Sequence, residues 1–111
     1  MKFTRHYTRP STDVPFHLEF RPKEVQDFYQ TEYIDHGHLT EEVTYSEDGL
    51  IMTIVQNWVD NPELIIGWMN HPTTLAWFEQ RDNYNAEKGI IKSNSTYEYT
   101  IKGKKMQGVA P

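Results

Sequence analysis

The chain has 111 residues, a formal net charge of −5 and no cysteine, and 14% of its residues are aromatic. This length makes one domain; the acidic balance argues against nucleic acid or an anionic membrane as a partner, and the lack of cysteine excludes disulfides and thiolate chemistry. No segment reaches the roughly 20 apolar residues of a membrane span, and MKFTRHYTRP lacks the apolar core of a signal peptide, so we expect a cytoplasmic protein.

The N-terminal part of the chain predicts a strand followed by a helix. In KFTRHYT, Phe3 and Tyr7 alternate with Thr4 and His6, which is the period of a strand. RPSTDVP then breaks the pattern with two prolines. A helix is predicted over about 22–34, because apolar side chains recur at three–four spacing between a starting proline and a closing glycine.

The next segment, LTEEVTYSEDGLIMTIVQNWV, predicts a β-hairpin around its EDG sequence. A two-residue loop at Glu47–Asp48 would pair Tyr45 with Leu50 and Val43 with Met52, and Asp-Gly also allows a three-residue loop with a bulge. In the first register one face of the hairpin is apolar, and the other is rich in threonine. The apolar face holds Leu39, Val43, Tyr45, Leu50, Met52 and Ile54.

Two helices and a last strand complete the predicted elements. Asp60 and Glu63 fit a helix-capping pattern, and Pro72 ends this helix near Asn70. A second helix runs from Pro72 or Thr73 to Lys88 and closes at Gly89. Its inward side is predicted to consist of Leu75, Trp77, Phe78, Arg81 and Tyr84. NSTYEYTI predicts the final strand, and residues 102–111 are expected to form a flexible tail.

The element order is therefore β-α-β-β-α-α-β, which predicts a single α+β domain. A four-stranded antiparallel sheet with helices on one face would form a two-layer sandwich. The reverse face carries threonines with Ile51 and Val55, but also His6, Glu42 and Asn57. This face can be exposed to solvent, or it can pack against a second copy of the chain in a twofold dimer.

One stretch resembles a known family. QNWVDNPELIIGWMNHPTTLAWF is similar to the dimeric α/β-barrel superfamily, and within it to the antibiotic-biosynthesis-monooxygenase-like branch. The similarity rests on Trp58 at a strand end, an acidic or Asn linker, a helix over 62–69, and the His71–Pro72 break. It implies a ferredoxin-like domain over residues 1–111 and a homodimer whose sheets face each other to close a barrel.

The resemblance also raises haem degradation as an activity to compare with this sequence. Haem-degrading members use an Asn on the first strand, a Trp on the middle helix and a later His. Trp68 matches the Trp, but Tyr7 and Phe78 stand at the other two places. Haem degradation by that route is not expected, and no cofactor is predicted.

Several side chains are candidates for a site. His71 and Tyr7 are the candidate proton-handling, catalytic residues, because imidazole and phenol can transfer protons. The candidate ligand-binding residues are Trp68, Trp77, Phe78, His6 and Asn57. Each has a structural alternative: His71 can cap a helix, the tryptophans can fill the core, and His6 and Asn57 can face solvent.

The sequence DHGH, residues 35–38, offers two imidazoles and a carboxylate, which Glu41 or Glu42 could supplement. A turn around Gly37 explains the same residues, so no metal is predicted.

Two functions remain open on these residues. The first is a homodimeric protein that binds a small aromatic or hydrophobic molecule between sheet and helices, with monooxygenase-like chemistry as the family implies. The second is a non-catalytic oligomeric accessory or structural protein. The Asn- and Tyr-rich composition is compatible with a viral or bacterial source, and whether the protein is an enzyme stays open.

Overall fold

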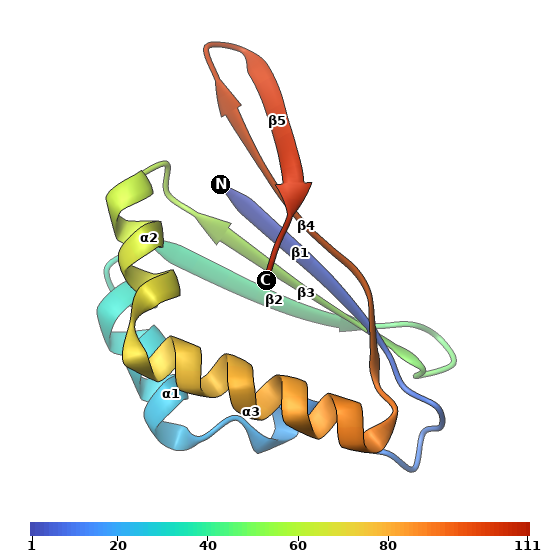
Figure 1. Cartoon of the computed structure of the whole chain (residues 1–111). Coiled ribbons are helices and arrows are strands. Elements are labelled where there is room, and N and C mark those ends of the chain that lie inside the picture. Colours follow the sequence, from blue (N-terminus) through green and yellow to red (C-terminus); the bar gives the residue numbers. More distant parts are fainter.

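A computed structural model describes residues 1–111, apart from the side chain of Ile101. The fold is α+β, with a five-stranded antiparallel sheet in the order β2-β3-β1-β4-β5 and three helices on one of its faces (Figure 1). A 3₁₀ turn, η1, precedes α1, and a π-helical turn, η2, follows it. The bounds are β1 Lys2–Thr8, η1 His17–Phe20, α1 Lys23–Tyr29, η2 Gln30–Ile34, β2 Leu39–Tyr45, β3 Ile51–Trp58, α2 Pro62–Asn70, α3 Pro72–Lys88, β4 Ile91–Ile101 and β5 Lys104–Val109.

Strand β1 lies at the centre of the sheet because both long connections cross over a neighbouring strand. The connection through α1 carries the chain from β1 to β2, with β3 between them, and the connection through α2 and α3 carries it from β3 to β4, with β1 between them. Strands β2 and β5 are the two edges, so the sheet of one chain is open and does not close into a barrel. The predicted α+β class and antiparallel sheet are confirmed; the expected four strands are one too few.

The β2–β3 hairpin has a different register from the predicted one. Tyr45 pairs with Met52, and Val43 pairs with Ile54, so the loop is longer than two residues. Ser46 Oγ and the Asp48 carboxylate hydrogen-bond at 2.6 Å and accept from backbone N–H groups across the turn, which stabilises the longer loop. Because the shift is two residues, every side chain keeps its predicted face.

The fifth strand occupies the segment where a flexible tail is expected. Lys102 and Gly103 both have positive φ, 50° and 79°, which is the conformation of a two-residue type I′ hairpin turn. Thr100 then pairs with Lys105, and Tyr97 with Gly108. A Cβ on Gly108 would lie 2.5 Å from the Tyr97 ring, so only glycine lets this ring cover β5.

The α2–α3 helical hairpin is predicted closely, with differences of one residue at two points. The cap of α2 is Asn61, whose Oδ1 accepts from the Leu64 N–H at 3.3 Å, and not Asp60. Gly89 closes α3 with φ 74°, as predicted. Leu75 is 51% exposed, and the neighbouring Thr74 takes the inward position. Trp77 and Arg81 are buried and Phe78 and Tyr84 half-buried, as the sequence predicts.

The core between sheet and helices consists of two apolar clusters. The larger is aromatic and centres on Trp68, which is fully buried and lies 4.8 Å from Trp58 and 5.9 Å from Phe3, between ring centroids. The smaller contains Tyr7 and Met52. Within the described residues, no helix has the length and apolar character needed to cross a membrane.

We predict that Trp68→Ala lowers the free energy of unfolding by about 3–5 kcal/mol, because it empties the centre of the larger cluster. Leu75→Ala serves as the matched control: its side chain is half in solvent, so the change is expected to stay within about 0.5 kcal/mol of the original protein. Urea titration monitored by circular dichroism measures both. Equal losses for the two variants would contradict the described burial of Trp68 on α2 and exposure of Leu75 on α3.

Candidate functional site

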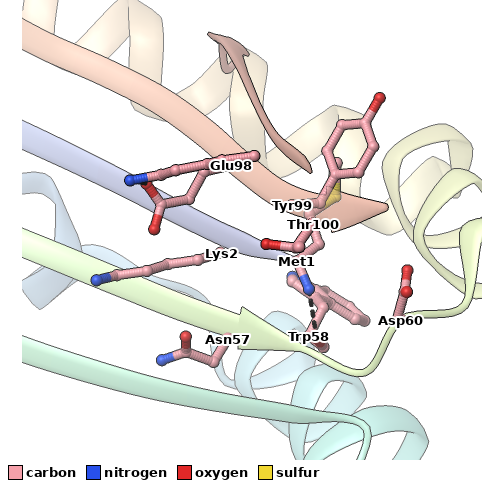
Figure 2. Close-up of a pocket in the computed structure, with 9 residues that line it drawn as sticks. Met1, Lys2, Asn57, Trp58, Asp60, Glu98, Tyr99 and Thr100 are labelled. Carbon is pink, nitrogen blue, oxygen red and sulfur yellow. Dashed lines mark hydrogen bonds and ion pairs between the residues drawn. The ribbon is translucent and has the colours of Figure 1, made fainter. Parts of the chain in front are cut away.

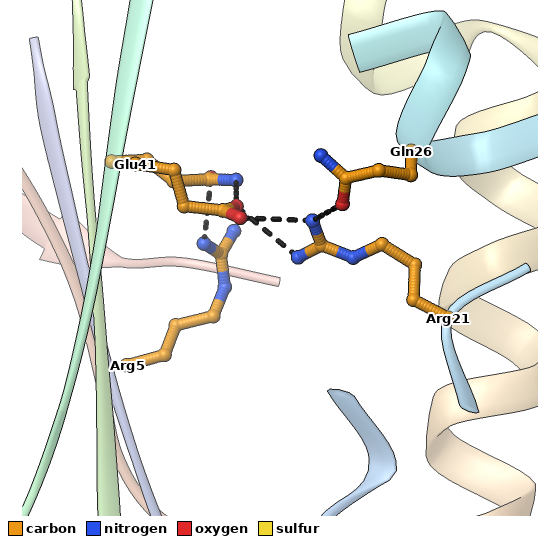
Figure 3. A network of polar contacts seen from close by, with 5 residues as sticks. Arg5, Arg21, Gln26 and Glu41 are labelled. Carbon is orange, nitrogen blue, oxygen red and sulfur yellow. Dashed lines mark hydrogen bonds and ion pairs between the residues drawn. The ribbon is translucent and has the colours of Figure 1, made fainter. Parts of the chain in front are cut away.

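A row of polar side chains crosses the helix-covered face of the sheet between the two apolar clusters. We call this row, Glu41 on β2, Gln56 on β3, Arg5 on β1 and Ser95 on β4, the polar stripe. Arg5 Nη1 donates to Gln56 Oε1 at 3.1 Å, and Gln56 Nε2 donates to Glu41 Oε2 at 2.8 Å (Figure 3). Except for the half-buried Glu41, its members are buried. Glu41, Gln56 and Arg5 therefore form a continuous hydrogen-bonded line beneath the helices, whereas Ser95 Oγ donates to the Ala110 carbonyl at 2.7 Å.

The helical layer contributes a second arginine to the stripe. Arg21, between η1 and α1, faces Glu41 with two N–H groups, at 2.8 and 3.2 Å, and also donates to Gln26 Oε1 at 3.0 Å (Figure 3). The side chains of Arg21 and Glu41 are 6% and 12% exposed. This bidentate ion pair fixes the orientations of the Arg21 and Glu41 side chains. It also links the segment before α1 to the sheet.

Arg81 on α3 is the third buried arginine of this region. It is 4% exposed, and its guanidinium lies 4.2 Å from the centroid of the Phe78 ring. Its Nε donates to the Asp82 carboxylate at 2.9 Å, but the Asp82 side chain is 60% exposed. Water screens that carboxylate, so it offsets the charge of Arg81 weakly.

The three arginines surround a small cavity between sheet and helices, which we call the arginine cavity. Its volume is about 20 Å³, enough for roughly one water-sized group. Four buried atoms of the lining residues have no hydrogen-bond partner among the described residues: Arg5 Nη2, Arg21 Nε, Tyr7 Oη and His17 Nδ1. The lining residues are Arg5, Tyr7, His17, Arg21, Tyr29, Glu41, Ile54, Gln56, Trp77, Phe78 and Arg81.

His17 is a neutral ring in this surrounding. It is 2% exposed, and its ring stands edge-on to Tyr7 with the centroids 4.4 Å apart. Its pKa falls to about 4, chiefly because burial disfavours the charged ring and secondly because Arg81 repels it; a contact with Asn85 that is looser than a well-formed hydrogen bond opposes the shift. At neutral pH the ring is uncharged and can still donate one hydrogen bond.

Tyr7 keeps its proton for a related reason. Burial raises the pKa of the Tyr7 hydroxyl, and the nearby Arg81 and Arg5 offset part of that increase. Arg81 approaches Oη without meeting hydrogen-bond geometry, so the hydroxyl has no partner among the side chains that the structure describes. At neutral pH Tyr7 is a hydrogen-bond donor and not a base.

A second hollow, the apolar groove, lies between α2 and the β4–β5 hairpin. It has a volume of about 430 Å³, and its walls are almost entirely aliphatic and aromatic. Ile66 and Val109 on opposite walls are 59% and 83% exposed. Tyr97 and Tyr99, whose rings stack at 6.1 Å, form the sheet side. The lining residues are Met1, Phe3, Asp60, Pro62, Ile65, Ile66, Met69, Tyr97, Tyr99, Val109 and Pro111.

A third hollow lies beside the groove, where β1 begins and β3 and β4 end (Figure 2). It measures about 410 Å³ and is mainly polar. The backbone nitrogen of Met1 donates to the Trp58 carbonyl at 2.8 Å, and Lys105 pairs with Glu98 at 3.2 Å. The side chains that line the hollow include two lysines, Lys2 and Lys105, and two carboxylates, Asp60 and Glu98.

The structure brings together three of the residues predicted from the sequence. Tyr7, Trp77 and Phe78 all line the arginine cavity. Trp68 lies behind them, 5.8 Å from the Phe78 ring, and borders none of the three hollows. Trp68 therefore supports the wall of the cavity from the core side.

The other predicted residues lie elsewhere. His71 caps α3, with its Nδ1 accepting from the Thr73 N–H at 3.1 Å, and its ring stacks on Phe28. It does not border the cavity that Tyr7 lines, so the two candidate catalytic side chains do not share a site. His6 and Asn57 are on the reverse face of the sheet: His6 Nδ1 bonds Thr53 Oγ1 at 2.8 Å, and Asn57 borders the polar hollow.

The DHGH segment forms the turn between η2 and β2. Gly37 has a φ of 72°, and the rings of His36 and His38 stack with their centroids 5.6 Å apart. Within the described part of the chain, no three His, Cys, Asp or Glu side chains are placed to share a metal ion.

Two polar residues of the cavity belong to no conventional site motif, but alternation along the strands places both of them. Arg5 shares its face with Phe3 and Tyr7, and Gln56 shares its face with Ile54 and Trp58. Side chains two apart on a strand point the same way. The usable signal was therefore a charged or amide residue at an inward position of an otherwise apolar face.

Comparisons with known proteins give a partial similarity. The chain is 34% identical over 76 residues, 67% of its length, to Cuticlin-6 of Caenorhabditis elegans. It spans 13% of the length of that curated relative, so the similarity concerns a small part of Cuticlin-6 and assigns no family. No protein-family model matches the chain. No solved structure matches it either.

We predict that the protein loses stability as the pH falls from about 6.5 towards 4, and that His17 causes part of this loss. The pKa of His17 is about 4 in the folded chain against 6.5 for a free ring, so the unfolded chain takes up a proton first and is favoured. The full contribution of His17 to this loss of unfolding free energy is about 3 kcal/mol. Urea titrations between pH 4 and 7.5 measure it.

His17→Gln should flatten this part of the pH profile, whereas the same replacement of His36 on the turn should leave it unchanged. If the unfolding free energies of His17→Gln and of the original protein depend on pH in parallel across this range, the ring is charged or solvent-exposed in the folded chain. The described burial of His17 then does not hold.

Proposed function

We propose that this chain is a small-molecule binding domain whose apolar groove takes a small hydrophobic or aromatic molecule. The observation that carries the proposal is the groove between α2 and the β4–β5 hairpin, with its volume of about 430 Å³ and its apolar walls. Ligand sites typically measure about 300–1,000 Å³ and combine apolar walls with a few polar groups. Asp60 at the rim supplies such a polar group.

The groove is suited to a flat molecule. The stacked rings of Tyr97 and Tyr99 form one wall, and the aliphatic side chains of α2 form the other. A ring inserted between them gains offset stacking and removes apolar surface from water. Monooxygenase-like chemistry has less support, because Tyr7 and His71 are on different parts of the molecule.

We predict that neutral 2-naphthol, used as a probe, binds in the groove and that Ile66→Asp weakens this binding at least tenfold. The change places a carboxylate on the groove wall at an exposed position, so folding should survive. A tenfold loss corresponds to about 1.4 kcal/mol. Titration followed by ¹H–¹⁵N NMR measures the affinity and locates the ligand.

Leu75→Asp is the matched control, since Leu75 is similarly exposed but lies on α3 outside the groove. The proposal fails if 2-naphthol shifts no groove resonances, or if both Asp variants lose affinity equally.

We also propose that the chain forms a homodimer through the open face of the sheet, as in the dimeric α/β barrels that its sequence resembles. The order β4-β1-β3-β2 with crossing helical connections supports the ferredoxin-like arrangement on which such dimers are built. The open face carries Thr4, Thr53 and Val55 in its centre, and Ile51 is 38% exposed at its end. Two such faces can pack with threonine hydroxyls paired across the contact.

We predict that sedimentation at micromolar concentration gives twice the chain mass, and that Val55→Arg converts the dimer into monomers. A charge at the centre of the face would be buried without a partner in the dimer. Ala86→Arg, on the exposed side of α3, adds the same charge away from the sheet and should remain dimeric. A monomer for the unmodified chain would refute the proposed assembly.

A second candidate function is that of a non-catalytic oligomeric, structural protein. It is favoured by the edge strands β2 and β5, which leave backbone groups unpaired, and by Ile91, 65% exposed beside the open face. The partial similarity to Cuticlin-6 is compatible with it. Association without any binding of 2-naphthol would favour this function over the first.

A further inference from the structure

The arginine cavity carries more positive charge than the protein around it balances. Arg5, Arg21 and Arg81 are each at least nine-tenths buried in their side chains, and Glu41 is the carboxylate that lines the cavity with them. Asp82, the partner of Arg81, is largely in water. Buried charges in proteins are normally paired, because an unpaired one costs several kcal/mol of desolvation.

The residues around the cavity also carry buried donors without acceptors. Arg5 Nη2, Arg21 Nε and Tyr7 Oη have no partner among the described residues, and the neutral His17 ring can donate through an unpaired Nδ1. All four belong to residues that line one space of about 20 Å³. A water molecule there could accept two hydrogen bonds, but it would leave the charge unbalanced. An anion could accept from several donors and balance the charge.

We infer that the arginine cavity binds a small monovalent inorganic anion, of halide size, held by Arg5, Arg21, Arg81 and the hydroxyl of Tyr7. The volume limits the ligand to a single atom or a group close to that size. The aromatic walls, Tyr29, Trp77 and Phe78, exclude bulk water and strengthen the electrostatic attraction inside. This site is separate from the apolar groove, and the inference does not depend on the proposed function.

Bound anion would work as a structural ligand. It would join Arg5 on the sheet to Arg21 before α1 and Arg81 on α3, so it would stabilise the contact between the two layers. Because the anion binds the folded chain and not the unfolded one, stability should rise with anion concentration.

The experiment uses sodium bromide as the probe, at constant ionic strength maintained with sodium methanesulfonate, whose anion is too large for the cavity. The expected result is saturable shifts of the Nε–Hε signals of Arg5 and Arg21 in ¹H–¹⁵N NMR, with half-saturation in the millimolar range. Crystals grown with bromide should show one anomalous peak within hydrogen-bond distance of Arg5 Nη2 or Tyr7 Oη.

Tyr7→Phe provides the decisive variant, because it removes a hydroxyl that has no partner in the described part of the chain and preserves the ring that packs in the core. It should fold and bind bromide at least fivefold more weakly. Lys88→Gln, which removes an exposed positive charge at the end of α3, should leave bromide affinity unchanged.

Arg81→Gln, studied in parallel, should abolish saturation; should it fail to fold, Tyr7→Phe still gives the answer. The inference is overturned if the shifts do not saturate, if the crystals show only water in the cavity, or if Tyr7→Phe and Lys88→Gln bind bromide as the original protein does.

Discussion

The structure depends on holding a line of charged and amide side chains inside an apolar layer. The polar stripe separates the cluster around Trp68 from the cluster around Met52. Glu41 pairs with Gln56 and Arg5 with Ser95, and Arg5 and Gln56 are diagonal neighbours on β1 and β3. On β1, Arg5 lies between Phe3 and Tyr7; on β3, Gln56 lies between Ile54 and Trp58. The hydrogen bonds among these side chains form in only one pairing of the strands, so the register of β1, β2 and β3 is fixed by the stripe as well as by the apolar faces.

The aromatic richness of the chain follows from the same constraint. Each buried guanidinium lies over at least one ring: Arg5 over Phe3 at 5.2 Å, Arg21 over Tyr29 at 5.2 Å, and Arg81 over Phe78 at 4.2 Å. A ring face attracts a cation by about 0.5–2 kcal/mol, more when water is excluded. Rings are therefore better walls for these charges than aliphatic side chains would be, and they fill the core at the same time.

Much of this fold could be predicted from the sequence, because alternation and helix signals are local. The α2–α3 helices, their break at His71–Pro72, and the faces of the β2–β3 hairpin were all predictable in this way. The hairpin register was not, since Ser46 and Asp48 stabilise a longer loop through side-chain bonds that the EDG pattern does not reveal. Nor was β5 predicted: its turn, Lys102–Gly103, resembles a basic tail unless the type I′ requirement for two positive φ values is considered.

The candidate site was predicted in part, because Tyr7, Trp77 and Phe78 are recognisable in the sequence as aromatic residues. Arg5 and Arg21 were missed, because charged residues are expected to be exposed, and Arg81 was predicted to face inward but not to belong to a site.

The polar stripe also determines how rigid the apolar groove is. Pro111 lines the groove, and its carbonyl accepts from Arg5 Nε at 2.9 Å; Ser95 Oγ holds the neighbouring Ala110 carbonyl at 2.7 Å. Both donors belong to the stripe, so the groove wall after β5 is anchored to the most constrained part of the molecule. Moving Pro111 outward would deprive Arg5 of an acceptor inside the core, where the loss of a charged hydrogen bond costs about 1.5–3 kcal/mol. The groove wall is therefore held in place before any ligand arrives, and binding there need not pay for ordering it.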